Sequence, residues 1–133
     1  MELYQQTEDI PVIGIQVTTF PNGIKEAFDS LFKNLGSSRA YYGISWMDDS
    51  DNVIYYAMAE EAFPGEGKSY NYESLVVEKG AYQTETIHNW LSKTDCIKDV
   101  FHRLMVNTNP DNKYPCIEWY KSDEEMLCMI RVV

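Results

Sequence analysis

The sequence has few basic residues. It contains 11 Lys and Arg against 21 Asp and Glu, which gives a formal net charge of −10 at neutral pH. Nucleic-acid binders need a basic surface that displaces the counterions of the phosphate backbone, and anionic membrane surfaces disfavour acidic proteins in the same way. The charge therefore argues against nucleic acids and membranes as partners, whereas a cationic small molecule or a basic protein is compatible with it.

Cysteine motifs, long apolar runs and metal-ligand clusters are also missing. Cys96, Cys116 and Cys128 show neither CxxC nor zinc-knuckle spacing, so we expect them to be reduced. No apolar segment has the form of a signal peptide or the length of a membrane span, and we expect a cytoplasmic protein. The two histidines, His88 and His102, have no third ligand at a recurring spacing, so no metal or other cofactor is predicted.

Tyrosine is the residue type that stands out among those present. The chain of 133 residues is 44% hydrophobic and 14% aromatic, with 10 Tyr against 5 Phe and 3 Trp. A chain of this length forms one domain and buries enough surface to fold without disulfides. Tyrosine combines an apolar ring with a polar hydroxyl and suits partly hydrated sites.

An internal repeat organises the sequence. Residues 22–60 align with residues 95–133 without a gap after a shift of 73 positions. The eight identical pairs are Ile24/Ile97, Lys25/Lys98, Phe28/Phe101, Leu31/Leu104, Asn34/Asn107, Tyr41/Tyr114, Ile44/Ile117 and Trp46/Trp119. Because these pairs follow helical and strand periodicities, we infer that one module has been duplicated.

Each copy has the same predicted elements. A β-branched strand precedes an amphipathic helix, and two strands joined by a polar turn follow it. The predicted elements are a strand at 12–20, a helix at 23–35 and a hairpin of 41–47 with 53–60 in the first copy, and a strand at 73–79, a helix at 96–107 and a hairpin of 114–120 with 126–133 in the second.

The predicted fold class is α+β. We expect one domain, 1–133, built from a duplicated strand–helix–strand–strand module with pseudo-two-fold symmetry, in which paired antiparallel sheets carry the helices on one side. The first repeat spans about 12–60, a linker spans 61–72, and the second repeat spans about 73–133. Residues 83–94 have no counterpart in the first copy and are expected to form a short helix or flap.

Strand alternation separates two sets of side chains in the central strands. Ile44, Trp46, Ile117 and Trp119 share one face, which we expect to be the core beneath the helices, with both tryptophans under Phe28 and Phe101. The other face has Gly43, Ser45 and Met47 in the first copy, and Cys116, Glu118 and Tyr120 in the second.

Glu118 is the unusual residue of this second face. It interrupts an apolar strand, and its partner in the other copy is the neutral Ser45. A carboxylate in such a setting is costly unless it is paired, exposed or used. Two interpretations follow: a strand face that is simply hydrated, or a pocket acid that attracts a cation or transfers a proton.

Two short motifs resemble a known family. Pro115–Tyr120 is similar to the P-x-x-E-x-Y strand of the GyrI-like small-molecule-binding superfamily, which includes the effector-binding domains of AraC- and MerR-type multidrug regulators, and 80–82 is similar to its G-x-Y motif. The resemblance covers nearly the whole chain, and we expect a stand-alone member of the family without a helix-turn-helix before it. It implies that Glu118 lies at the floor of a cleft between the copies, with Tyr120 and Tyr82 as the motif aromatics and lipophilic cations as ligands.

Further pocket-wall candidates come from the pattern around this strand. Tyr56 falls on the Glu118 face if the turn is a four-residue loop between Met47 and Asn52 and these two residues pair. A change of one residue in the length of that loop puts Tyr55 there in place of Tyr56. Trp90, in the 83–94 segment, is either an anchor or a lining residue.

The predicted function is therefore the binding of a cationic or aromatic small molecule. No catalytic residue is assigned, but Glu118 is the candidate acid or base if the protein is a hydrolase of electrophilic compounds, which some stand-alone members of the family are. A protein-binding modulator of the gyrase-inhibitor type is the third hypothesis. The identity of the ligand stays open.

Overall fold

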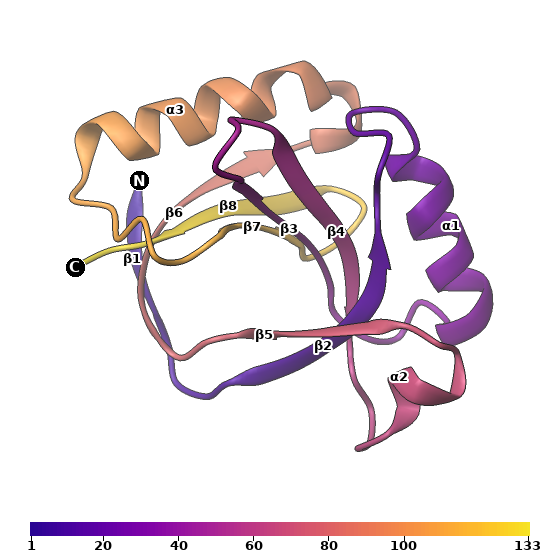
Figure 1. Cartoon of the computed structure of the whole chain (residues 1–133). Coiled ribbons are helices and arrows are strands. Elements are labelled where there is room, and N and C mark those ends of the chain that lie inside the picture. The colour runs from indigo at the N-terminus through magenta and orange to yellow at the C-terminus, as the bar shows by residue number, and fades with distance from the viewer.

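The chain folds around one antiparallel sheet of eight strands, and the computed structural model describes all residues, 1–133. The strands follow the order β1-β6-β8-β7-β3-β4-β2-β5 across a curled sheet (Figure 1). Their bounds are β1 Glu2–Gln6, β2 Ile10–Gln16, β3 Tyr41–Met47, β4 Val53–Glu60, β5 Glu73–Val77, β6 Gly80–His88, β7 Cys116–Tyr120 and β8 Glu125–Arg131.

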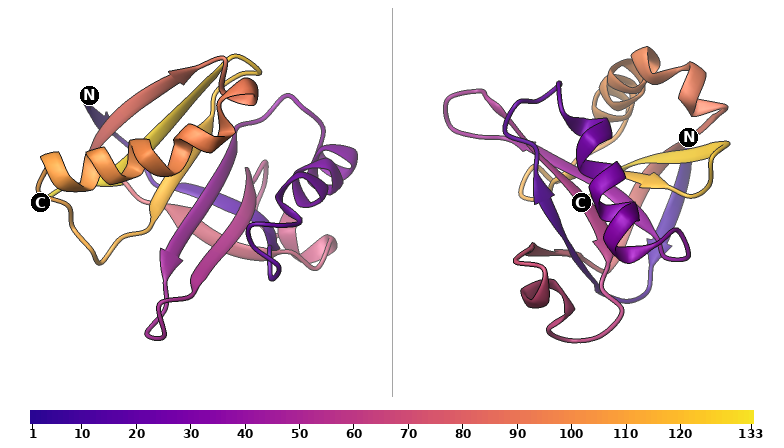
Figure 2. Two further views of the ribbon diagram at one scale, coloured as in Figure 1. Left: turned by 90° about the horizontal axis from the view of Figure 1, so that it is seen from above. Right: turned by 90° about the vertical axis from the view of Figure 1, so that its right-hand side faces the viewer.

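Two long helices lie on the same face of the sheet. Helix α1, Ile24–Leu35, packs on β4, and helix α3, Ile97–Asn107, packs on β8. The two helices are well separated when the molecule is seen from above (Figure 2). Helix α2, Glu66–Ser69, is a single turn, and two short 3-10 helices at Trp90–Ser92 and Thr94–Cys96 precede α3. No helix has the length and apolar character that crossing a bilayer requires.

The predicted duplication and the α+β fold class are confirmed. Strands β3 and β7 pair at the centre of the sheet, and the order of strands on one side repeats the order on the other. The two hairpins have the same register, because Ile44 pairs with Tyr56 and Ile117, 73 positions later, pairs with Met129. The pseudo-two-fold axis therefore passes between β3 and β7. The sheet is continuous, and β1 and β5 each pair with a strand of the opposite half.

The predicted start of the second copy is wrong. Strand β6, not the segment at 73–79, is the counterpart of β2, and residues 83–88 are part of β6 and do not form a helix or flap. Gly14 pairs with Met58 and Tyr82 pairs with Arg131. Arg131 lies 73 positions after Met58, but Tyr82 lies only 68 after Gly14, so the second copy has five more residues between strand and helix. These extra residues fall in the turns that lead to α3.

The assignment of the two sheet faces is also wrong. Ile44 and Ile117 do share a face, but it is the concave one, where the curled sheet encloses Val12, Met58, Val77, Tyr82 and Met129. The helices cover the opposite face, which carries Glu118. Alternation along a strand groups residues by face, but it does not tell which face the helices cover. A sheet that curls on itself can bury one face with its own strands.

The two tryptophans consequently have different surroundings from those predicted. Trp46 is 37% exposed and stacks on Tyr56, with ring centroids 5.5 Å apart. Trp119 is half-buried at the edge of the concave core. Neither lies beneath α1 or α3.

Candidate functional site

Glu118 lies in β7 on the face that the helices flank, near the pseudo-two-fold axis. Its Oε1 atom accepts hydrogen bonds from the hydroxyls of Tyr55 and Tyr120, each at 2.6 Å. The two hydroxyl oxygens are 3.3 Å apart. Tyr55 comes from β4 of the first copy and Tyr120 from β7 of the second, so both copies hold the same carboxylate oxygen.

A glycine in β3, which has no side chain, makes room for this arrangement. Gly43 pairs directly with Glu118 across the two central strands. A Cβ atom at position 43 would overlap with Oε1 of Glu118 and with the hydroxyl of Tyr55. Glycine inside a strand often marks such a close approach. The counterpart of Gly43 in the second copy is Cys116, so only one carboxylate of this kind fits in the fold.

The charge of Glu118 has no basic partner. The ion pairs of the molecule are Lys25–Asp29, Arg39–Glu66 and Arg103–Glu85, none of which involves this residue. Its second oxygen, Oε2, accepts no hydrogen bond from another group of the protein. The site thus has one carboxylate oxygen held in place and one without a partner.

Burial shifts the acidity of all three groups. Desolvation raises the pKa of Glu118, and the hydrogen bonds from Tyr120 and Tyr55 oppose that rise. Desolvation, reinforced by the charge of Glu118, holds the pKa of Tyr55 and of Tyr120 well above the ordinary tyrosine value. The tyrosines therefore stay protonated and act as donors, and Glu118 is the first of the three groups to ionise as pH rises.

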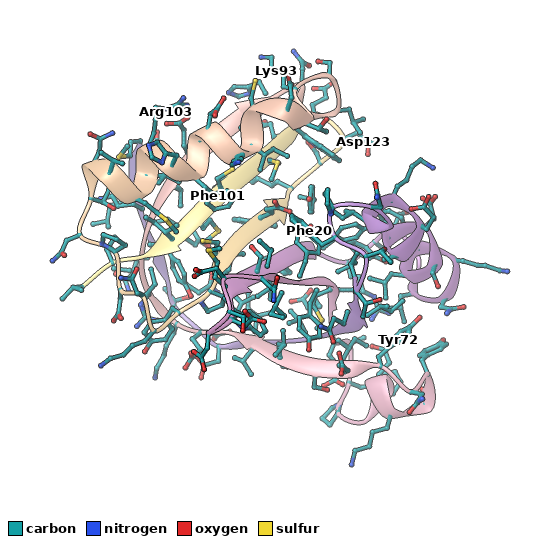
Figure 3. All side chains as sticks on the ribbon, turned by 45° about the horizontal axis from the view of Figure 1, so that its top comes forward. Phe20, Tyr72, Lys93, Phe101, Arg103 and Asp123 are labelled. Atoms are coloured by element: carbon teal, nitrogen blue, oxygen red, sulfur yellow. The ribbon has the colours of Figure 1, made fainter.

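Aromatic rings surround the two tyrosines. Phe20, on the loop before α1, stacks on Tyr55 with centroids 5.3 Å apart. Phe28 of α1 and Trp90 contact Tyr120, with centroids 5.2 and 4.9 Å away. Phe101 of α3 packs against the same buried cluster as Tyr120 and Trp90, and Figure 3 shows it beneath α3, with Phe20 beside α1.

Trp90 and Phe20 both lie in segments that lead to a long helix, but they are held differently. The indole Nε1 of Trp90 donates a hydrogen bond to the carbonyl of Ser122, at 2.9 Å. Phe20 has no polar tether and is 37% exposed. It also lines a surface hollow of about 430 Å³ that continues along 51–54. Phe20 therefore separates this hollow from the ring of Tyr55.

The structure brings together some of the predicted site residues and not others. Tyr120 and Trp90 lie with Glu118, as described above. Tyr82 is fully buried on the concave face, where its hydroxyl donates to the carbonyl of Glu78 and Arg131 lies over its ring. Tyr82 therefore does not lie beside Glu118.

Tyr56 is also on the far face of the sheet. Met47 pairs with Val53, so the turn contains five residues and not four. Strand β4 is therefore shifted by one position relative to a pairing of Met47 with Asn52. Tyr55 consequently takes the place beside Glu118, and Tyr56 stacks on Trp46. A one-residue change of register moves every side chain to the opposite face.

Phe20, Phe28 and Gly43 were not predicted as parts of the site. A glycine in the middle of an otherwise bulky strand, 41–47, was the available signal for Gly43. Phe28 matched a helix core position and gave no separate signal. Phe20 lies outside the aligned repeat, so nothing in the sequence placed its ring on Tyr55.

Neither of two surface hollows in the structure has Glu118 as a lining residue. One is the hollow beside Phe20, and the other, of about 300 Å³, is lined by Gly14, Ile15, Gln16, Asn71, Tyr72 and Glu73. The rings of Phe20, Phe28 and Trp90 pack instead on the two tyrosines that hold the carboxylate. No group of three His, Cys, Asp or Glu side chains is arranged to hold a metal ion.

Solved structures with the same fold are available for comparison. An integron cassette protein from the mobile metagenome of Vibrio cholerae matches with 16% identity and a TM-score of 0.70, and the match covers all of both chains. SAV2435, solved with bound tetraphenylphosphonium, matches with 12% identity and a TM-score of 0.71 over 99% of this chain and 93% of its own. A hydrolase from Listeria innocua matches with 10% identity and a TM-score of 0.56 over 99% and 91%.

No protein-family model and no curated protein matches the sequence. The structural matches run over the full length of the chain and establish the GyrI-like fold. At these identities the likeness concerns the fold.

Proposed function

We propose that this protein binds lipophilic aromatic cations at Glu118, between its two copies. The observation that carries the proposal is the combination of a carboxylate without a basic partner and aromatic rings from both copies around it. SAV2435, which has the same fold, was solved with the cation tetraphenylphosphonium.

The chemistry of the site favours a delocalised cation over a small hydrated one. Charge attraction to Oε2 and cation–π contacts with the tyrosine rings each contribute about 1–2 kcal/mol in a partly desolvated site. A compact inorganic ion would have to give up its hydration for a single free carboxylate oxygen. A bulky organic cation is weakly hydrated and gains further from apolar contact with the rings.

Access to the site depends on Phe20. Its ring covers Tyr55 on one side and borders the hollow along 51–54 on the other. Trp90 is tied to Ser122 and stays in place. We therefore expect a ligand to enter by displacing Phe20 while Trp90 serves as a fixed wall.

The proposal is tested by titration calorimetry with tetraphenylphosphonium. Glu118→Gln keeps the shape of the site and removes its charge, so we expect the affinity to fall by about 10- to 100-fold, the usual range for a lost charge-assisted contact. Glu124→Gln, on the exposed turn of the same hairpin, is the matched control and should bind like the wild type. Triphenylphosphine oxide, a neutral ligand, should not distinguish Glu118 from Gln.

Two outcomes contradict the proposal. One is the absence of wild-type binding for tetraphenylphosphonium and for other triaryl or quaternary cations. The other is an equal affinity in the wild type and the Glu118→Gln variant.

A hydrolytic function is the second candidate, and the raised pKa of Glu118 favours it. A carboxyl group whose pKa lies nearer neutrality can accept and return a proton, while Tyr55 and Tyr120 hold it in position. One solved structure with this fold is a hydrolase. Mass analysis of electrophilic substrates after incubation separates the two functions, because Glu118→Gln would abolish turnover and leave substrate binding nearly intact.

A further inference from the structure

Trp46 and Trp119 occupy equivalent positions in the two copies, on the concave face of the sheet and away from Glu118. Their surroundings differ. Trp119 is covered by Tyr4, with ring centroids 6.0 Å apart, and by Tyr42, at 6.3 Å. The Nζ atom of Lys121 lies over the same indole, 5.5 Å from the ring centroid. Trp119 is thus covered by two tyrosines from the first half of the chain and by Lys121 of its own copy.

Trp46 has no comparable covering side chains. It is 37% exposed and stacks only on Tyr56. The repeat shift of 73 places Asp48 where the second copy has Lys121. Glu73 is the counterpart of Tyr4. Tyr4 pairs with Tyr82, and Glu73 pairs with Gly14. Gly14 and Tyr82 are equivalent positions of β2 and β6. Two of the three positions that cover Trp119, those of Tyr4 and Lys121, therefore correspond to an acid around Trp46.

Acidic side chains extend the surface around Trp46. The turn of the β3–β4 hairpin carries Asp49 and Asp51, and neither forms an ion pair. Met47 and Val53, the last pair of the hairpin, lie on the opposite face of the sheet. We use the term Trp46 surface for Trp46 and Tyr56 together with the acids Asp48 and Glu73.

We propose that the Trp46 surface docks a basic segment of a partner protein, with a lysine or arginine side chain lying on the indole of Trp46 as Lys121 lies on Trp119. The second copy is an internal template for this contact. Ammonium and guanidinium groups favour the face of tryptophan over other aromatic rings. The acids at 48 and 73 and the net charge of −10 attract a basic chain to the same place.

The charge pattern also decides against other occupants. A second copy of this chain would bring an equally acidic surface to Asp48 and Glu73. A purely apolar partner would desolvate these carboxylates without compensation. A basic segment neutralises the acids and covers the rings of Trp46 and Tyr56 with the methylene stems of its long side chains.

The experiment follows the three indole N–H signals in ¹⁵N-labelled protein, assigned with single Trp→Phe variants. The probe is an acetylated and amidated octapeptide of alternating Arg and Gly. We expect the Trp46 signal to shift on titration while the signals of Trp90 and Trp119 stay in place. The same peptide with citrulline for arginine is neutral and should leave all three unchanged. Shifts of equal size at all three indoles, or none at Trp46, would overturn the proposal.

Variants separate docking from general charge attraction. Trp46→Leu should weaken binding of the arginine peptide at least five-fold, whereas Phe63→Leu, at another exposed aromatic residue, should not. Asp48→Lys reproduces the arrangement of the second copy and should compete with the peptide for the indole. Asp49→Lys makes the same charge change without that geometry. If both lysine variants weaken binding equally, only non-specific attraction is present and the proposal fails.

This proposal and the cation site at Glu118 fail independently. Tetraphenylphosphonium should shift the Trp90 signal and leave Trp46 unchanged, and the arginine peptide should do the reverse. A result in which the free side-chain analogue ethylguanidinium binds Trp46 as tightly as the peptide would also contradict docking of a protein segment.

Discussion

The two copies of the module share their helix cores and differ at the sheet beside them. Leu31 of α1 and Leu104 of α3 are equivalent, and both side chains are fully buried. Two residue pairs on the same face have diverged: Gly43 corresponds to Cys116, and Ser45 corresponds to Glu118. The glycine of one copy makes room for the carboxylate of the other. Duplication thus supplied a symmetric scaffold, and a single site arose where the copies stopped matching.

The concave face shows a second difference between the copies. There Tyr4 and Lys121 cover Trp119 of the second copy, whereas Trp46 of the first copy is exposed beside acids. Positions that match carry the fold, and positions that differ carry the candidate sites.

The largest expected effect tests the symmetric part of this comparison. Leu31→Ala and Leu104→Ala each remove a fully buried side chain at equivalent positions. We expect each to lower the free energy of unfolding by about 2–5 kcal/mol through lost burial and a residual cavity. Urea denaturation followed by circular dichroism measures both. If the two losses of unfolding free energy differed by more than the smaller of them, the two helix cores would not be equivalent.

The tryptophans test the asymmetric part. Trp119→Ala opens the edge of the concave core and should cost about 3 kcal/mol. Trp46→Ala removes an exposed ring with one stacking partner and should cost about 1 kcal/mol or less. Thermal and chemical denaturation of the two variants provide the comparison. Equal losses would contradict the difference in cover described for these two residues.

Gly43→Ala tests the fit between the copies. Its Cβ would collide with Oε1 of Glu118 and the Tyr55 hydroxyl. We expect a loss of about 1–3 kcal/mol of stability from overpacking and weaker binding of tetraphenylphosphonium. Ser45→Ala, on the same face of the same strand, is the control and should change either quantity little. The double variant Ser45→Glu with Glu118→Ser should not bind the cation, because Cys116 and not a glycine lies opposite position 45.

Small effects come from the tyrosine hydroxyls. Tyr55→Phe and Tyr120→Phe each remove one hydrogen bond to Oε1, and each should cost about 1–2 kcal/mol. Both bonds oppose the rise in the Glu118 pKa, so either variant should raise that pKa further. Carbon-13 NMR of the Glu118 carboxyl during a pH titration measures the shift. A lower pKa in either variant would show that the hydroxyl does not donate to the carboxylate.

The raised pKa of Glu118 also sets the sign of two pH effects. Because the folded state holds this proton more tightly than the unfolded state, the stability contribution is complete below the ordinary glutamate pKa and is lost as pH rises through the raised pKa. Affinity for tetraphenylphosphonium runs the other way, since it requires the ionised carboxylate. Glu118→Gln should show neither dependence in this window, as calorimetry and denaturation at matched pH values can check.

Much of the fold was readable from the sequence because local periodicities encode it. The helix periodicity around Phe28 and Phe101 and the alternation in the 41–60 segment predicted elements within about a residue of those observed. The acid in an apolar strand and its neutral partner in the other copy singled out Glu118. Tyr120 and Trp90 followed from the strand motif and from the segment after β6.

The remaining errors have a common physical origin. Periodicity depends on neighbours along the chain, whereas the errors concern contacts between distant segments. The Tyr55/Tyr56 choice depended on one residue in a turn. The position of Tyr82 depended on how β6 pairs with β8 and where the sheet curls.

The sequence by itself determined the duplicated module, its helices and hairpins, and the acid at position 118, because each depends on residue types at short and regular spacings. Only the tertiary structure decided which sheet face the helices cover, which tyrosines hold the carboxylate, and that Phe20 lies on Tyr55. Those outcomes depend on the curl of the sheet and on the crossing of β1 and β5 to the opposite halves. Both are set by the combined packing of the whole chain, and no single segment contains them.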